Sequence, residues 1–310
     1  MDSMNHNEIK KINVYTIQEI NKQINNFVNI QEKETTKENY KILLTKFYNY
    51  CMENQINNIT INNHEIIIKQ YKANLLNNTS LASTSINNYI LRLQSFFNFL
   101  GMPSKIKKLN DGYKSKPYKY LTKKEIDLLI NTIEETEPNQ ELKARNKAII
   151  YLLFSGGLRV QELLNITQTD LKNNIIFITG KGKARDIKEP IIIPDKTKEL
   201  LNSYLKERTN KKRQCNYLFC NIQDKQMTRQ GINLFLKKYA KKTDLKHNIN
   251  IYPRCSSHVF RHSLARYLII NKNIPLHQVK DILRHSKIET TTKYLTNSQE
   301  ELKQIRLNLL

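Results

Sequence analysis

The stretch from Cys255 to Thr296 reads CSSHVFRHSLARYLIINKNIPLHQVKDILRHSKIETTTKYLT. His258 and Arg261 are three residues apart, so on a helix they lie on one face, one turn from each other. A second imidazole, His285, and a phenol, Tyr294, follow within the same segment. Two imidazoles, a guanidinium and a phenol form a set that could bind a phosphodiester and attack it.

The hydrophobic spacing predicts two helices in this stretch. Ser256 or Ser257 suits the N-cap of the first helix, and Pro275 suits the first turn of the second. The side chains expected to face the interior are Leu264, Tyr267 and Leu268 in the first helix and Val279, Ile282 and Leu283 in the second. The second helix then delivers His285 at its C-terminal end.

The composition of the chain points to a polyanionic partner. Its 310 residues include 51 Lys and Arg against 28 Asp and Glu, which gives a net charge of +23 and a pI near 9.7. Such an excess is typical of proteins that bind nucleic acid. A chain of this length is predicted to form about two domains. No apolar run approaches the length of a membrane span and no signal peptide is evident, so we expect a cytoplasmic protein with no membrane partner.

Residues 1–100 are predicted to form an N-terminal helical bundle. Apolar residues recur at three- and four-residue spacing in four segments between Thr16 and Leu100, a pattern that is helical throughout. Thr35 and Glu38 match a capping box at the start of one of these helices. The periodicity then stops, and Gly, Pro and a run of lysines predict a basic linker over residues 101–120.

Residues 121–310 are predicted to form a second domain that is mainly helical. Thr122 and Glu125 match a capping box at its start, and Gly156-Gly157 suits the end of a longer helix. Residues 174–179 and 187–194 are predicted to be strands of a small antiparallel hairpin, joined by a turn that contains Lys181. Further helices are predicted over 196–208 and 228–242, and the apolar spacing of 299–310 predicts a short terminal helix that docks. The fold class is therefore mainly α with a small antiparallel β-sheet.

The candidate catalytic residues suit phosphoryl transfer to a side-chain nucleophile. Guanidinium groups such as Arg159 and Arg261 match the non-bridging oxygens of a phosphate under attack better than lysines do. A phenol becomes a nucleophile when cations and a histidine base lower the cost of losing its proton. The full set is Arg159, Lys181, His258, Arg261, His285 and Tyr294. No cluster of acidic residues resembles a two-metal nuclease site, so we expect no metal.

The same residues occur in the order and local spacing of a known family. The motifs SGGLRVQELL, ITGKGKARD, SHVFRHS and LRHSKIETTTKY follow one another along the second half of the chain. With this pattern the chain strongly resembles the tyrosine recombinases of the phage integrase family, nearest to the Xer type. The resemblance covers nearly the whole chain and implies a SAM-like core-binding bundle followed by a catalytic domain.

The resemblance implies a role for each residue. Tyr294 attacks the scissile DNA phosphate and forms a 3′-phosphotyrosyl linkage, while Arg159 and Arg261 clamp the phosphate. Lys181 is the general acid, and His258 and His285 assist as base and hydrogen-bond donor. Glu162 matches a position that supports the site.

The resemblance also implies the partners of the chain. It implies a double-stranded DNA recombination site and a homotetramer that joins two such sites, with no cofactor, metal or ATP. Dimer resolution in chromosome partition and the integration or excision of a mobile element both remain open, as does an accessory protein. Whether the terminal helix docks in cis or in trans also stays open.

Two positions depart from the family pattern. Family members usually have Gly immediately before the second histidine, where this chain has Arg284, which either contacts DNA or points outward. The strand after the lysine hairpin is also slightly longer and carries extra charges, and Lys183 is a second choice for the acid.

Three alternatives accompany this prediction. Cys255, His258 and His262 have a C-x2-H-x3-H spacing that in principle suits zinc, but a fourth ligand is lacking. A catalytically silent DNA-binding protein would keep the basic surface without the chemistry. An enzyme that resembles a type IB topoisomerase would cleave without a defined site and without a tetramer.

Overall fold

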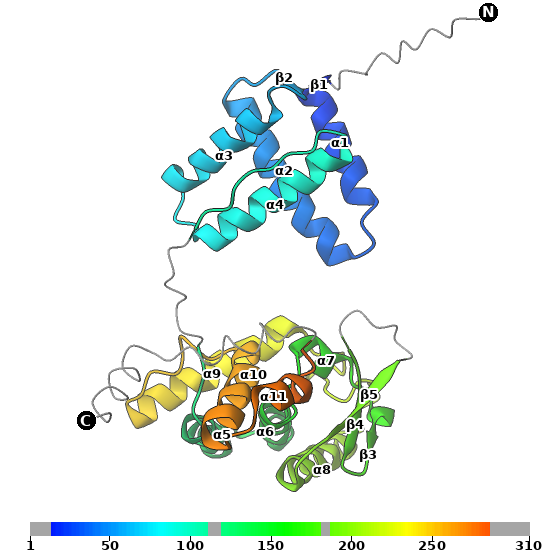
Figure 1. Ribbon diagram of the computed structural model, residues 1–310. Coiled ribbons are helices and arrows are strands. Elements are labelled where there is room, and N and C mark those ends of the chain that lie inside the picture. The colour runs from blue at the N-terminus through cyan, green and yellow to red at the C-terminus, as the bar shows by residue number, and fades with distance from the viewer. Residues whose placement is uncertain (1–13, 111–118, 181–186, 286–310) are drawn as a thin grey trace, which may run out of the picture. The chain divides into compact units, whose positions relative to one another are not determined.

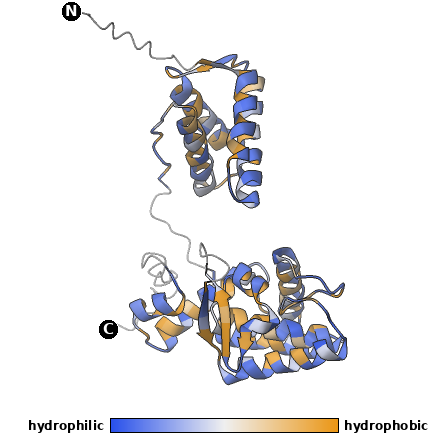
Figure 2. Ribbon diagram, turned by 90° about the vertical axis from the view of Figure 1, so that its right-hand side faces the viewer, coloured by the Kyte–Doolittle hydropathy of each residue, from blue (hydrophilic) through white to orange (hydrophobic). Residues whose placement is uncertain are grey.

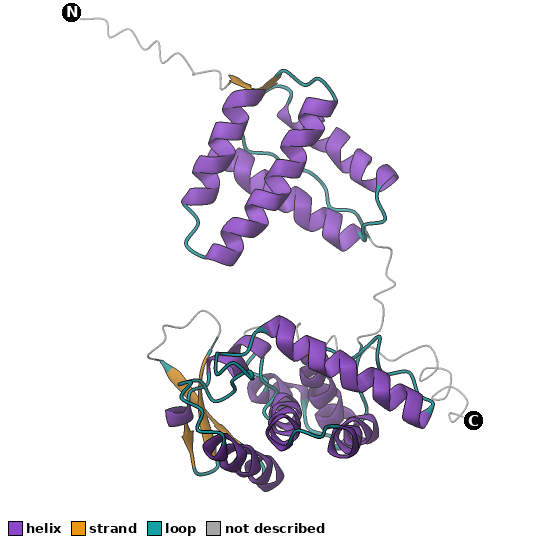
Figure 3. Ribbon diagram, turned by 180° about the vertical axis from the view of Figure 1, so that it is seen from behind, coloured by secondary structure: helices purple, strands orange, loops and turns teal. Residues whose placement is uncertain are grey.

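The computed structural model describes residues 14–110, 119–180 and 187–285. The chain separates into two compact units, Met1–Ser115 and Lys116–Leu310, and each is described by itself (Figure 1). Lys181, Lys183, Tyr294 and the terminal segment from Gln299 lie outside the described residues. Helices dominate both units, and the sheets are small and antiparallel (Figure 3). The predicted fold class is confirmed.

The first unit is a bundle of helices with one small sheet. The helices are α1 (Ile17–Asn29), α2 (Glu34–Glu53), α3 (His64–Asn78) and α4 (Ser83–Phe99). Two short strands, β1 (Val14–Thr16) and β2 (Asn58–Thr60), pair antiparallel, with Tyr15 opposite Ile59. The sequence pattern predicts helices alone between Thr16 and Leu100, so β2 is a correction. Its three residues are too few to show the alternation that identifies a strand.

The start of α2 also differs from the prediction. Its N-cap is Lys33, which makes no side-chain capping bond, and Thr35 lies inside the first turn. The predicted capping box of Thr35 and Glu38 is therefore wrong. The capping box of this unit belongs to α1, where the Thr16 hydroxyl accepts a hydrogen bond from the Glu19 N–H at 3.3 Å.

The segment after α4 packs along the bundle. Met102 and Ile106 are buried in the same apolar core as the helices. The backbone N–H of Leu109 donates to the Asn87 side chain at 2.7 Å, and the Asn87 amide donates back to the Leu109 carbonyl at 3.0 Å. Residues that the sequence assigns to the start of a linker thus contribute to the core of the first unit.

The second unit places a sheet beside a cluster of helices. Its elements are α5 (Lys123–Thr136), α6 (Gln140–Ser155), α7 (Val160–Asn165), β3 (Leu171–Lys172), β4 (Ile175–Thr179), β5 (Lys188–Ile192), α8 (Asp195–Asn210), α9 (Arg229–His247), α10 (Ser257–Arg266), a π-helical turn (Tyr267–Asn271) and α11 (Leu276–Ile282). The strands form an antiparallel sheet in the order β3-β4-β5. The predicted hairpin is confirmed, with Phe177 opposite Pro190.

Helix α6 lies at the centre of this unit. It packs against α5, α8 and α10, and its apolar residues are buried on several sides. Apolar residues also occupy the strands (Figure 2). The capping box of Thr122 and Glu125 at the start of α5 is confirmed, with the Thr122 hydroxyl accepting from the Glu125 N–H at 3.2 Å.

The end of α11 is largely as predicted. Val279 and Leu283 are fully buried, whereas Ile282 is 44% exposed and its predicted inward packing is wrong. Helix α11 is short, so one apolar face accommodates only some of its hydrophobic residues. Within the described ranges, no helix is both long and apolar enough to cross a bilayer.

Candidate active site

Arg159 lies at the start of α7, immediately after the turn that ends α6. Gly157 in that turn has a φ of +55°, a left-handed conformation that glycine adopts without strain. The Arg159 backbone N–H donates to Oε2 of Glu162 at 2.9 Å, and its guanidinium Nη1 donates to Oε1 at 2.6 Å. Both bonds join residues of one helical turn, so the start of α7 fixes the direction of the Arg159 side chain.

Glu162 is ionised although it is only 4% exposed. Burial alone raises the pKa of this carboxyl. The hydrogen bonds from Arg159 and the charges of Arg284 and Arg159 outweigh that effect, so the pKa lies below its usual value. The supporting role predicted for Glu162 has a physical basis in these contacts.

Arg261 projects from the middle of α10 and is only 1% exposed. Its guanidinium donates to the carbonyls of Gly157 and Leu283. The first carbonyl belongs to the turn after α6, and the second ends α11. One side chain therefore ties together three segments that are far apart in the sequence.

His258 lies one turn before Arg261 on α10. Its ring meets that of His262 edge-on, with centroids 4.4 Å apart. The residue keeps an exposed side, yet its pKa is lowered, first by lost hydration on the side that faces the unit and then by the charges of Arg261, Arg159 and Arg229. The neutral imidazole is therefore favoured, and that form can accept a proton.

His285 is placed by the backbone that ends α11. The His285 N–H donates to the Lys280 carbonyl at 3.0 Å, and the Arg284 N–H donates to the Asp281 carbonyl at 2.9 Å. This pair of bonds is a Schellman motif, with Arg284 in the left-handed position. Burial, followed by the charges of Arg261 and Arg159, lowers the pKa of His285 to about 4, so its ring is neutral at neutral pH.

The structure brings together Arg159, His258, Arg261 and His285 of the predicted set. The charges of both arginines lower the pKa of each histidine. The two guanidiniums donate to neighbouring carbonyls at the end of α11, those of Arg284 and Leu283. The chemical result is a cationic cluster with two neutral imidazoles, which suits a phosphate under attack. Lys181 and Tyr294, the predicted acid and nucleophile, lie outside the described residues.

Sequence reasoning missed two neighbours of this cluster. From the sequence alone, Arg284 is a departure from the family pattern and His262 is a candidate zinc ligand, and neither has a predicted place in the cluster. Burial followed by the charges of His258 and Arg261 lowers the pKa of His262 to about 3. The spacing of His262 four residues after His258 is the signal that places both rings on one helical face.

The zinc alternative receives no support from the described residues. The Cys255 thiol is buried and bonds weakly to the Leu236 carbonyl, with 3.8 Å between sulfur and oxygen. Burial raises the pKa of Cys255 to about 12, which disfavours the thiolate that zinc requires. Within the described ranges, no group of three or more His, Cys, Asp and Glu side chains has an arrangement that could hold a metal ion.

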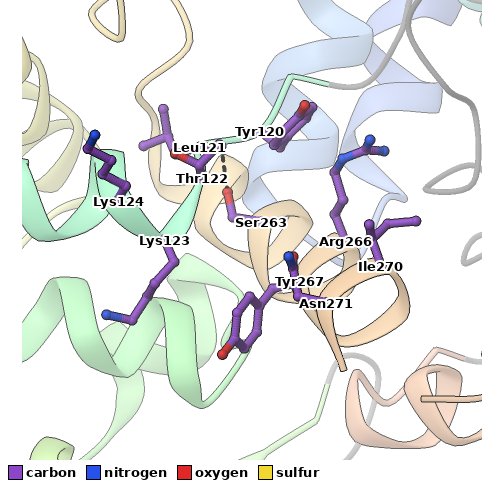
Figure 4. Close-up of a pocket in the computed structure, with 10 residues that line it drawn as sticks. All are labelled: Tyr120, Leu121, Thr122, Lys123, Lys124, Ser263, Arg266, Tyr267, Ile270 and Asn271. Atoms are coloured by element: carbon purple, nitrogen blue, oxygen red, sulfur yellow. Dashed lines mark hydrogen bonds between the residues drawn. The ribbon is translucent and has the colours of Figure 1, made fainter. Parts of the chain in front are cut away.

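A pocket of about 370 Å³ lies on another side of α10 (Figure 4). The Leu121 N–H donates to the Ser263 hydroxyl at its wall, at 2.8 Å. The guanidinium of Arg266 lies over the Tyr120 ring, 4.5 Å from its centroid. This pocket is not lined by any member of the cluster of Arg159, His258, Arg261 and His285.

Comparisons with known proteins identify relatives of this chain. A model of the phage integrase family matches residues 119–301. Over 224 residues the chain is 32% identical to the tyrosine recombinase XerD of Halalkalibacterium halodurans, a match that covers 69% of this chain and 71% of that protein.

Solved structures share the fold over almost the whole chain. The XerH site-specific recombinase bound to difH substrate in a pre-cleavage complex has a TM-score of 0.66 at 21% identity, covering 93% of this chain and 84% of that one. The Tn1549 transposon integrase in complex with transposon right end DNA has a TM-score of 0.70 at 19% identity, covering 96% and 99%. The family model, which matches more than half of the residues of the chain, and the XerD relative at 32% identity show that the chain belongs to the phage integrase family of tyrosine recombinases.

Proposed function

We propose that this tyrosine recombinase cuts and rejoins DNA at a specific site with Tyr294 as its nucleophile. The phenol oxygen attacks the scissile phosphorus as the bond from phosphorus to the 5′-oxygen breaks. A 3′-phosphotyrosyl bond forms and a 5′-hydroxyl leaves. The observation that carries the proposal is the cluster of Arg159, Arg261, His258 and His285, in which the charges of both arginines act on both histidines and hydrogen bonds fix each guanidinium.

The two arginines stabilise the phosphate during attack. Negative charge grows on its non-bridging oxygens, and guanidinium groups fixed in advance stabilise that charge without rearranging. Glu162 fixes Arg159, and two backbone carbonyls fix Arg261. Their donors are thus oriented before the DNA arrives.

The proton transfers follow from the states of the side chains. His258 is held in its neutral form, and its free ring nitrogen lone pair accepts the proton of the Tyr294 phenol. His285 is neutral and donates an N–H to the phosphate. Lys181 gives a proton to the leaving 5′-oxygen. The reverse attack by a 5′-hydroxyl of another strand returns each proton and reseals the DNA, so the phosphoester energy is conserved and no ATP is required.

The partner that fits this chemistry is duplex DNA. The net charge of +23 supports strong electrostatic binding to phosphates. Exchange between two sites needs four nucleophiles, and we therefore propose a homotetramer on two sites, working in the cytoplasm. In this proposal residues 1–100, together with the packed segment that ends at Leu109, form the core-binding domain, the rest of 101–120 is the linker, and 121–310 is the catalytic domain with its docking helix.

A suicide-substrate assay tests the proposal. Nicked duplexes from around the gene of this protein are incubated without added metal, and covalent protein–DNA adducts are scored for the wild type, Tyr294→Phe and the control Tyr252→Phe, an exposed tyrosine of the same unit. The wild type and the control should form a 3′ adduct that Tyr294→Phe lacks. Retained salt-dependent binding without any adduct would instead indicate a silent DNA-binding protein, and adducts on every sequence would indicate an enzyme that resembles a topoisomerase.

A further inference from the structure

Helix α11 ends in a conformation that its sequence does not favour. Arg284 occupies the left-handed position of the Schellman motif, with a φ of +56°. Glycine adopts this conformation freely, whereas a residue with a Cβ is strained there. A strained residue persists only where its surroundings hold it. The contacts of the Arg284 side chain supply that hold.

The Arg284 guanidinium lies inside the unit. Its Nη2 donates to Oε2 of Glu162 at 3.1 Å, and Nη1 donates to the Ile282 carbonyl at 3.2 Å. Longer contacts of 3.4 and 3.5 Å reach the carbonyls of Gly157 and Gly156. The side chain is only 17% exposed. Arg284 is therefore no ordinary surface cation.

These contacts close a ring of interactions with Arg159. One oxygen of Glu162 accepts from both the Arg159 backbone N–H and Arg284, and the other accepts from the Arg159 guanidinium. In the opposite direction, the Arg159 guanidinium donates to the Arg284 carbonyl at 3.4 Å. Two direct hydrogen bonds thus join the start of α7 to the end of α11, although more than a hundred residues separate them in the sequence.

We propose that Arg284 is a positioning residue that fixes the start of α7 against the end of α11, and so sets Arg159 and His285 relative to each other. This inference rests on the proposed function for its effect on DNA cleavage. A free surface cation at the same position would instead contact the DNA backbone, and the two readings differ in what they predict for affinity.

Lys212 offers a matched control for a change at Arg284. It occupies the same left-handed position after α8, with a φ of +52°, and its N–H donates to the Thr209 carbonyl at 2.9 Å. The residue is exposed, and among the described residues its side chain forms no ion pair with a carboxylate. Arg284→Gly and Lys212→Gly therefore remove the same charge and the same backbone strain, and only the first removes the ring of contacts.

Single-turnover cleavage and DNA affinity separate positioning from binding. Arg284→Gly should cleave a saturating suicide substrate about tenfold more slowly than Lys212→Gly, a loss typical of one charge-assisted contact. Affinity and its salt dependence should match those of the control. Arg284→Lys should not restore the rate, because an ammonium lacks the planar fork that bridges a carboxylate and two carbonyls.

Two results would overturn the inference. The first is equal cleavage by Arg284→Gly and Lys212→Gly. The second is a weaker affinity of Arg284→Gly with a salt slope reduced by about one, the signature of a phosphate contact. Amide hydrogen exchange provides a readout independent of cleavage: protection at Arg159 and His285 should fall about tenfold in Arg284→Gly and stay unchanged in Lys212→Gly. Wild-type adduct formation tests the proposed function separately, so failure of one is distinguishable from failure of the other.

Discussion

Removing the charge of Glu162 should destabilise the second unit strongly. In Glu162→Gln the side chain keeps its shape, but two guanidiniums lose the carboxylate that accepts from them at 2.6 and 3.1 Å. Breaking a buried ion pair typically costs 3–5 kcal/mol. Because Arg159 and Arg284 retain partial solvent access, we expect the lower end, about 3 kcal/mol, in the free energy of unfolding. For a unit of this size that corresponds to a fall in Tm of roughly 6–12 °C.

Urea unfolding and calorimetry of the full chain measure this loss. The control is Glu199→Gln, which removes a carboxylate that is 66% exposed and 3.2 Å from Lys196. An exposed pair of this kind contributes little, so the control should stay within about 0.5 kcal/mol of the wild type. A loss in Glu162→Gln no larger than that of Glu199→Gln would refute the reasoning.

The stability difference between the wild type and Glu162→Gln should also depend on pH, in a direction that follows from the pKa of Glu162. The folded pKa of Glu162 lies below the ordinary value of 4.5. The carboxylate therefore stabilises the fold fully above pH 4.5, and its contribution is lost as the pH falls through the lower folded pKa. The difference in stability between the wild type and Glu162→Gln should be constant near neutral pH and should close in acid. A difference that widens below pH 4.5 would contradict the assignment.

Three further predictions concern other parts of the fold. His285 is held neutral with a pKa of about 4, so its ring resonances should titrate near that pH by NMR, and titration near 6.5 would contradict this. Because the unfolded chain binds this proton more readily, the unfolding free energy of the wild type should fall as the pH drops from about 6.5 to 4. That fall should be smaller in His285→Asn. Met102→Ala should lower the unfolding free energy by about 2–5 kcal/mol in urea melts, because Met102 is fully buried. The control Met52→Ala changes an exposed residue and should alter the unfolding free energy little. Equal effects of the two substitutions would mean that Met102 belongs to a linker and not to the core. Gly157→Ala should lower the Tm, because its φ is +55° and the new Cβ would lie within 3.0 Å of two leucine side chains, while Gly231→Ala, at an ordinary φ, should leave the Tm nearly unchanged.

Local signals in the sequence predicted the elements of the second unit well. The capping box of Thr122 and Glu125 and the strands flanking the lysine turn depend on neighbours only a few residues away. The same kind of signal failed at Thr35, because the helix begins at Glu34 and its cap is Lys33, two residues before the predicted cap. Capping motifs do not exclude a neighbouring start, because several residues at a helix end compete for the same donors.

Contacts between residues far apart in the sequence are the part of the candidate site that the sequence could not predict. Motif spacing indicated that Arg159, Arg261 and His285 belong together. It could not indicate that Glu162 accepts from two arginines, since the second, Arg284, is 122 residues away. Ile282 shows the same limit within a helix: its spacing fits an apolar face, but which residues that face buries depends on the elements packed against it.

The anchoring of Arg261 has a consequence for conformational entropy. A free arginine side chain carries about 2 kcal/mol of rotamer entropy, which is lost when its guanidinium is fixed. Here the carbonyls of Gly157 and Leu283 fix it on folding. In the proposed reaction this entropy loss therefore reduces the free energy of unfolding, and it is not incurred again when DNA binds or is cleaved.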